Sequence, residues 1–177
     1  MANTMTLVST VTVGAGGAAS IDFTGIPQTG TDLYLVFSGR TTTGTTTYAD
    51  SLYIRLNGVA TNMNFVRVRG LGSGAPISDS GTGNSLLSDG TTATASTFSN
   101  ANIYLTNYTT SVKKTFSGDM VTENNATEGV QIILAGDSNT VTAAITQLSI
   151  TNGTFEQYTT ASLYIIDKTG ATGATVA

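Results

Sequence analysis

Carboxylates are the residues of this chain that come closest to a catalytic arrangement. Asp119 with Glu123, or Glu123 with Glu128, could supply the acid and the base of a glycosidase. The chain has no histidine and no cysteine, so the commonest general base and the commonest strong nucleophile are both missing. It also has no GxSxG sequence that would activate a serine. Scattered surface acids explain these carboxylates better, and we expect no catalytic residue and no enzymatic activity.

Three short motifs resemble parts of known sites, but each lacks the context that its chemistry needs. Asp79-Ser80-Gly81 matches an aspartic-protease carboxylate, yet it lies in a Gly/Ser-rich segment instead of at a rigid, apolar strand end. Asp167-Lys168-Thr169-Gly170 matches the phosphorylated aspartate of P-type ion pumps, without their membrane spans or nucleotide domain. Gly70, Gly72 and Gly74 are spaced like part of a phosphate-binding loop, but no helix follows them. We expect no cofactor at any of these motifs.

Metal binding is equally poorly supported by the residue types. Without histidine and cysteine, the ordinary zinc, haem and iron–sulfur sites are excluded. The segment from Asp79 to Asp89 could offer oxygen ligands to calcium. It contains only two carboxylates in eleven residues and lacks the spacing of an EF-hand loop. We therefore expect no metal site.

Tyrosines are the remaining candidates for ligand recognition. Saccharide sites usually stack a flat aromatic ring on the sugar, and the chain has no tryptophan. That role would fall to one of five tyrosines, namely Tyr48, Tyr53, Tyr104, Tyr108 and Tyr158. Most of them alternate with aliphatic residues, so some face outward, which is also typical of protein interfaces. The residues alone do not separate sugar binding from protein binding.

Charged residues are scarce, at 10% of the chain against about 25% in average soluble domains. The net charge of −4 argues against nucleic-acid binding, which depends on lysine and arginine. No apolar run approaches the roughly 20 residues that span a bilayer, and the first ten residues do not resemble a signal peptide. We expect a soluble protein, made in the cytoplasm, that binds neither nucleic acid nor membrane.

Alternating apolar and polar residues recur along the whole chain, and no segment has a sustained helical period. Threonine fills about a fifth of the chain, which suits half-solvated strands. In residues 32–40, the alternation predicts that Leu33, Leu35 and Phe37 face the core, with Tyr34 and Val36 on the other side. The pattern as a whole predicts an all-β fold. It favours an antiparallel, jelly-roll-like β-sandwich of about nine or ten strands.

Turn signals define the expected organisation of the chain. Asn57-Gly58 and Asn152-Gly153 predict β-hairpins, because both residues of such a pair accept the positive φ of a type I′ turn. Residues 70–97 are rich in Gly, Ser, Thr, Asp and Asn and are expected to form one long loop. We predict a single β-sandwich domain over residues 1–168, followed by a small-residue tail at 169–177.

Several strand-and-turn stretches resemble small β-sandwich proteins encoded among the structural genes of tailed bacteriophages. The likeness covers most of residues 20–166 and is clearest in 144–150, 152–155 and 161–165, which read AITQLSI, NGTF and ASLYI. Earlier parts of it are IPQTGTDL, LYIRLNG and NIYL. The resemblance implies a head decoration protein, a head fibre or a tail-fibre domain. It implies a role in the virion and no chemistry.

The resulting hypothesis is a virion structural protein, specifically a capsid decoration or cement protein that binds the outer shell as a homo-oligomer. Its partner would be the major capsid protein or another virion protein. The first strand, the 70–97 loop and the 169–177 tail are the expected contact segments. The alternative is a head- or tail-fibre module that binds a host surface glycan or protein. An enzyme acting on polysaccharide is the third and least favoured class.

Overall fold

The computed structural model describes residues 5–42, 49–59, 63–72, 74–123 and 129–168. Within these ranges it contains β-strands and no helix, which confirms the all-β prediction. There are twelve strands, a few more than the nine or ten expected. They are β1 (Met5–Thr12), β2 (Ile21–Thr24), β3 (Asp32–Gly39), β4 (Ala49–Leu56), β5 (Asn64–Gly70), β6 (Ile77–Thr82), β7 (Asn84–Asp89), β8 (Ser99–Leu105), β9 (Thr115–Glu123), β10 (Gly129–Asp137), β11 (Gln147–Thr151) and β12 (Thr160–Ile166).

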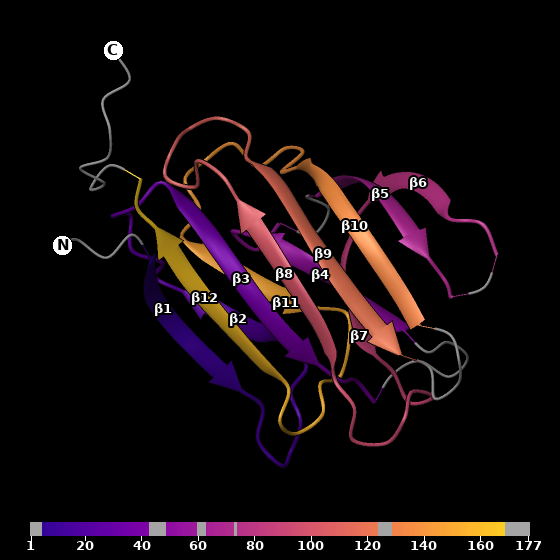
Figure 1. Ribbon diagram of the computed structural model, residues 1–177. Helices are drawn as coiled ribbons and strands as arrows, with labels where there is room; N and C mark the ends of the chain where they lie inside the picture. Colours follow the sequence, from indigo (N-terminus) through magenta and orange to yellow (C-terminus); the bar gives the residue numbers. More distant parts are fainter. Residues whose placement is uncertain (1–4, 43–48, 60–62, 73, 124–128, 169–177) are drawn as a thin grey trace.

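The strands form two antiparallel sheets that pack as a sandwich (Figure 1). The larger sheet has the order β1-β12-β3-β8-β9-β10-β5-β6, and the smaller sheet has the order β2-β11-β4-β7. Eight of the strands form four pairs that are nested in the sequence: β1 with β12, β2 with β11, β3 with β8, and β4 with β7. Nested antiparallel pairs that alternate between two sheets are the topology of a jelly roll. The predicted fold class is therefore confirmed.

The remaining four strands extend the larger sheet beyond the jelly roll. β5 and β6 form one hairpin, β9 and β10 form another, and β10 pairs with β5 to join the two. The strands β9-β10-β5-β6, which we call the extension, continue the sheet from β8. In Figure 1 they occupy the right-hand part of the larger sheet.

The alternation in β3 is as predicted. Leu33, Leu35 and Phe37 are almost fully buried, whereas Val36 is exposed on the opposite face. One continuous hydrophobic cluster contains these residues together with buried side chains from the other sheet, such as Ile54 and Ile150. Burial of side chains of this size contributes about 1.5–3 kcal/mol each, so the two facing sheets supply the main stabilisation.

The first strand departs from simple alternation. Met5 and Leu7 are exposed, whereas Val11, which simple alternation would place on the same face, is half-buried. The pairing of β1 with β12 shifts register between Leu7 and Ser9, which indicates a β-bulge. A bulge inserts one residue and so exchanges the two faces. Val8, at the bulge, and Val11, beyond it, pack against the core.

The two Asn-Gly signals produce turns but not the predicted hairpins. Asn57 and Gly58 have φ values of 52° and 73°, as the turn requires. However, β4 lies in the smaller sheet, and β5 pairs with β10 and β6 in the larger one. Asn152, with φ 78°, likewise connects strands of different sheets, β11 and β12. A turn sequence sets the local backbone angles, and the strands that follow need not pair with each other.

Residues 70–97 are not one long loop. They contain β6, at the edge of the larger sheet, and β7, at the edge of the smaller sheet. Leu86 and Leu87 of β7 are buried, whereas the described residues of β6 are exposed or half-buried. Polar edge strands of this kind lack a continuous apolar pattern, which explains why the sequence indicated a loop.

Candidate functional site

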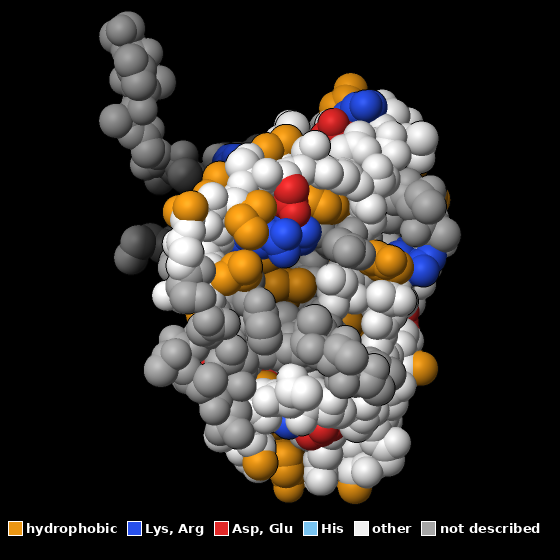
Figure 2. All heavy atoms as spheres, turned by 90° about the vertical axis from the view of Figure 1, so that its right-hand side faces the viewer, with side chains coloured by type: hydrophobic (Ala, Val, Ile, Leu, Met, Phe, Trp, Pro, Cys, Tyr) orange, Lys and Arg blue, Asp and Glu red, His pale blue; other side chains and the backbone are white. Residues whose placement is uncertain are grey.

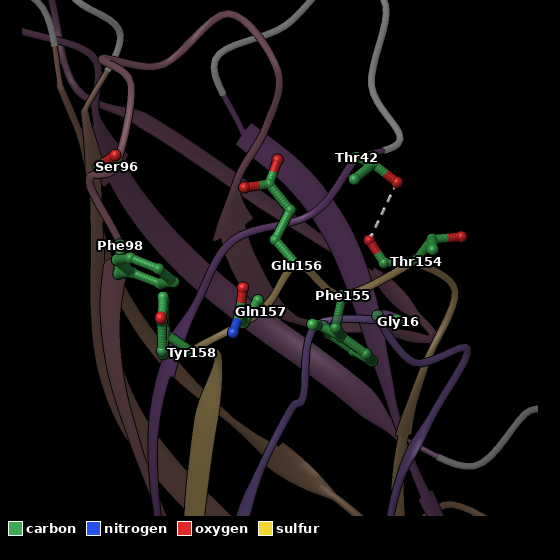
Figure 3. Close-up of a pocket in the computed structure, with 11 residues that line it drawn as sticks. Gly16, Thr42, Ser96, Phe98, Thr154, Phe155, Glu156, Gln157 and Tyr158 are labelled. Atoms are coloured by element: carbon green, nitrogen blue, oxygen red, sulfur yellow. Dashed lines mark hydrogen bonds between the residues drawn. The ribbon is translucent and has the colours of Figure 1, made fainter.

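A cleft lies at one end of the sandwich, where four loops meet. Its volume is about 770 Å³. The loops are the β1–β2 turn, the segment after β3, the β7–β8 loop and the β11–β12 loop. We call it the loop cleft; it is lined by Ala15, Gly16, Gly17, Thr42, Ser96, Phe98, Thr154, Phe155, Glu156, Gln157 and Tyr158. Figure 3 shows the two aromatic side chains Phe98 and Tyr158 on one side, Thr42 and Thr154 on the other, and Glu156 and Gln157 between them.

Backbone strain in the described residues concentrates at the loop cleft. Six non-glycine residues have positive φ, and four of them are asparagines, which tolerate this conformation. The other two are Ser96, with φ 65°, and Tyr158, with φ 72°. Both line the loop cleft. A bulky residue with positive φ is an outlier that persists only when its surroundings hold it, and such outliers are typical of functional sites.

Arg40 connects two of the loops that form the loop cleft, the β7–β8 loop and the β11–β12 loop. Its side chain is nearly buried, and its Nε lies 3.1 Å from Oε2 of Glu156 on the β11–β12 loop. Its Nη1 donates to the carbonyl oxygens of Thr94 (2.8 Å) and Thr97 (3.3 Å) on the β7–β8 loop. Because one guanidinium binds both loops, the positions of Phe98 and Tyr158 depend on each other.

Backbone hydrogen bonds anchor the β11–β12 loop on its other side. Phe155 is fully buried, and its amide and carbonyl both bond to Ala18. The Tyr158 amide donates to the Val13 carbonyl at 2.9 Å. A Cβ on Gly17, which has φ 69°, would lie 2.9 Å from the Phe155 carbonyl oxygen, so only glycine fits there. The loop that carries Tyr158 is thus held from both sides.

The side chains that face the loop cleft suit a neutral, hydroxyl-rich ligand. Tyr158 is 67% exposed, and Phe98 is half-buried. Glu156 is partly exposed and has one carboxylate oxygen held by Arg40, which leaves Oε1 to accept bonds from a ligand. Gln157 supplies an amide, and Thr42 and Thr154 supply hydroxyls.

A second surface lies on the outer face of the extension. Val66, Val68, Val121 and Ile133 are 59%, 49%, 48% and 65% exposed. They alternate with residues of the same strands that are buried or half-buried, so they point away from the core. Val68 and Ile133 are direct cross-strand partners, and Val66 and Val121 lie two residues away on neighbouring strands. We call these four residues the extension patch.

The extension patch borders a shallow hollow of about 500 Å³. Asn102, Tyr104 and Asp119 line it, and so does Ile133 of the patch itself. The Asn102 amide donates to Asp119 Oδ1 at 2.6 Å, which holds that carboxylate in place beside the hollow. An apolar patch beside a hollow is a common form of protein-docking surface.

The structure does not bring together the carboxylates considered as catalytic pairs. Asp119 and Glu123 are four residues apart on β9, so their Cα atoms are about 13 Å apart, beyond the spacing of glycosidase carboxylates. Glu123 instead accepts hydrogen bonds from Thr94 and Thr97 and stabilises the β7–β8 loop. Glu128 lies outside the described residues.

The sequence did not predict a contact between Glu123 and Asp89. Asp89, at the end of β7, is fully buried, and its Oδ1 accepts a hydrogen bond from the Glu123 amide at 3.1 Å. Its Oδ2 has no hydrogen-bond partner among the described residues. Burial raises the pKa of Asp89, because the ionised form loses its hydration.

Asp79-Ser80-Gly81 lies on β6 and forms cross-strand pairs with β5. Asp79 binds Nε of Arg67 at 2.6 Å and Nη2 of Arg69 at 3.4 Å. The Arg67 hydrogen bond is the main cause that holds the pKa of Asp79 below its ordinary value. Gly81 lies under the ring of Phe65, on which the Arg67 guanidinium also stacks. Figure 2, viewed from the side of β5 and β6, shows basic and acidic side chains in contact with hydrophobic ones around them.

The structure also places the glycine motif and the two aspartates considered as calcium ligands. Gly72 and Gly74, with φ 80° and 88°, lie in the turn between β5 and β6. Asp79 and Asp89, the proposed calcium ligands, lie in different sheets. In the part of the chain that the structure describes, no group of three or more acidic, histidine or cysteine residues could hold a metal ion.

Lys168 of the Asp167-Lys168 motif forms an ion pair with the buried carboxylate of Asp32. Tyr104 also donates a hydrogen bond to Asp32 Oδ2, and the Asn107 amide donates to Oδ1 at 2.9 Å. Burial alone would raise the pKa of Asp32, but the bonds from Lys168, Tyr104 and Asn107 together lower it.

The four described tyrosine candidates have different environments. Tyr108 is fully buried, and its hydroxyl donates to the Pro27 carbonyl. Tyr104 binds Asp32, and Tyr53 lies beneath the Arg55 guanidinium, 5.9 Å from it. Tyr158 is the one that lines the loop cleft. Tyr48 lies outside the described residues.

A buried lysine forms a further polar centre that was not predicted from the residue pattern. Lys114 is fully buried, and its ammonium donates to the carbonyls of Thr110 (2.8 Å), Val112 (2.6 Å), Thr142 and Ala143 (2.7 Å). Burial lowers the pKa of Lys114, whereas the surrounding carbonyl dipoles favour the charged form. The residue joins the β8–β9 turn to the segment before β11.

Comparisons with known proteins give no family for this chain. A scan against protein-family models, a search of curated proteins and a search of solved structures each found no match. Over the described ranges, no helix has the length and apolar character needed to cross a lipid bilayer. The loop cleft and the extension patch are therefore the two surfaces of the described residues that bear on function.

Proposed function

We propose that this protein is a bacteriophage virion structural protein, specifically a capsid decoration protein that binds the outer shell through its extension patch. The observation that carries this proposal is the outward-facing group Val66, Val68, Val121 and Ile133 on strands that the jelly roll itself does not need. Exposed contiguous apolar side chains are typical of surfaces that another protein covers.

The size of the outer face is adequate for a stable contact. Eight strands spaced by about 4.8 Å, each roughly 23 Å long, give the whole outer face of the larger sheet an area of about 800 Å², of which the four strands of the extension make up about half. This matches the area that one partner contributes to a standard protein interface. The low proportion of charged residues also allows symmetric copies to pack on a shell without strong mutual repulsion.

Binding of this protein would stabilise the shell by mass action. A protein that binds only the assembled capsid stabilises the assembled state, and the effect grows with the concentration of free protein. Decoration therefore requires surface complementarity and many copies, and it requires no catalytic group.

The proposal is tested with capsids of the same phage that lack this protein. Purified protein is mixed with them, the capsids are sedimented, and the bound protein is quantified. We expect saturable binding and a higher melting temperature of the capsid. Ile133→Asp should weaken binding at least tenfold, because it places a charge in the centre of the extension patch.

Val112→Asp is the matched control. Val112 is 56% exposed, similar to Ile133, but it lies in the β8–β9 turn outside the extension patch. It should bind capsids as the unmodified protein does. Absence of binding to capsids, or equal binding by Ile133→Asp, would refute the proposal.

A further inference from the structure

The loop cleft has the structural marks of a ligand-binding site that is separate from the extension patch. Its lining includes both non-asparagine residues with strained φ, Ser96 and Tyr158. The strain at Tyr158 displays a large ring to solvent instead of burying it. The buried Arg40 and the backbone bonds to Val13 and Ala18 maintain this arrangement. A site that is held in place before binding loses little entropy when a ligand arrives.

The residues of the loop cleft favour one class of ligand. None of the eleven described residues that line it is a lysine or an arginine, so none of them offers a cationic side chain to a phosphate, sulfate or sialic acid. Among the described lining residues the charged side chain is Glu156, and its partner Arg40 is nearly buried, so an anion would meet a carboxylate first. The other lining side chains include three aromatic rings, of which that of Phe155 is buried, one amide and three hydroxyls.

We infer that the loop cleft binds a neutral saccharide. Tyr158 and Phe98 would contact the C–H face of a pyranose ring, since polarised C–H groups are attracted to the negative face of an aromatic ring. Oε1 of Glu156 would accept hydrogen bonds from two adjacent sugar hydroxyls, and charged acceptors form the stronger bonds. The volume, about 770 Å³, lies within the range of small-molecule sites.

Binding is measured first with an array of neutral and acidic glycans and then by calorimetric titration of the purified protein with the neutral glycan that binds best. Tyr158→Asn is the most informative variant, because asparagine tolerates the positive φ and removes only the ring. We expect it to raise the Kd at least tenfold without loss of thermal stability. Phe98→Ala should have an effect of similar size.

Ile133→Asp separates saccharide binding from capsid docking. Ile133 lies on the outer sheet face and does not line the loop cleft, so this variant should bind the glycan with unchanged Kd while losing capsid binding. Tyr158→Asn should show the reverse pattern. The inference is overturned if no neutral glycan binds, if only acidic glycans bind, or if Tyr158→Asn leaves the Kd unchanged.

Discussion

Arg40 and Glu156 are 116 positions apart in the sequence, yet Nε of the arginine lies 3.1 Å from Oε2 of the glutamate. The same guanidinium binds three backbone carbonyls of the β7–β8 loop, those of Ala93, Thr94 and Thr97. This single side chain therefore connects the two loops that present Phe98 and Tyr158. Its removal should affect both the stability of the protein and the shape of the loop cleft.

Arg40→Met should lower the free energy of unfolding by about 2–4 kcal/mol, because three carbonyls lose a hydrogen bond from the guanidinium and Glu156 loses its partner. Urea denaturation measures this change. Glu156→Gln should cost less than about 1 kcal/mol, since that carboxylate is 34% exposed. Arg55→Met is the control, because the Arg55 guanidinium bonds to Thr151 and not to a loop of the cleft. Equal losses for Arg40→Met and Arg55→Met would contradict the role assigned to Arg40.

Tyr158→Asn should be more stable than Tyr158→Ala by about 1 kcal/mol. Both substitutions remove the same ring, but alanine is strained at φ 72° and asparagine is not. Thermal unfolding of the two variants under identical conditions gives the comparison. If the alanine variant were as stable as the asparagine variant, the backbone at this position would not be strained.

The two buried aspartates should give opposite dependences of stability on pH. The pKa of Asp32 is lowered in the folded state, so its contribution is present above the unfolded value of about 3.9 and is lost as the pH falls through the folded value. The pKa of Asp89 is raised, so stability decreases as the pH rises from the unfolded value through the folded value.

Asp32→Asn should therefore destabilise the protein at pH 7, by about 1–3 kcal/mol, and by less at pH 3. Asp89→Asn should leave stability unchanged or increase it at pH 7, because it removes a buried charge whose Oδ2 has no partner among the described residues. Denaturation midpoints of both variants, measured between pH 3 and pH 7, test these two expectations. A loss of stability in Asp89→Asn that is larger at pH 7 than at pH 3 would show that the sign for Asp89 is wrong.

Lys114→Met should destabilise the protein by about 2–4 kcal/mol, because it leaves four backbone carbonyls without their donor in a buried site. Lys113→Met is the control at the neighbouring position. Lys113 is 57% exposed and lies 3.9 Å from Asp137, so its loss should change stability by no more than about 0.5 kcal/mol. Chemical denaturation of both variants tests whether the hydrogen bonds from Lys114 to these carbonyls stabilise the fold.

Local patterns in the sequence predicted the strands with apolar alternation and the turns with asparagine. Leu33, Leu35 and Phe37 are buried as expected, and Asn57 adopts the expected positive φ. Pairing between strands was not predictable, because alternation defines faces and not partners. The strands β6 and β7 were missed because both are edge strands within a segment dominated by small and polar residues.

The loop cleft could not have been located from the sequence. Its lining comes from four loops, and Gly16 and Tyr158 are separated by most of the chain. Tyr158 was one of five equivalent tyrosine candidates, and nothing in its neighbourhood signals a positive φ. Arg40 was not selected at all, since an arginine at the end of a strand is usually solvated. Only the nested strand pairing brings these residues together.

Nested pairing also has a consequence for biosynthesis. Met5 pairs with Ile166, so the ribosome delivers the partner of β1 about 160 residues later, on the order of ten to thirty seconds at ordinary translation rates. During that interval β1 is an unpaired strand that could associate with another nascent chain. Thr6, Thr10 and Thr12 make it more polar than an ordinary core strand. Until β12 emerges and the roll can close, the threonines keep the surface of this unpaired strand more polar than that of a core strand.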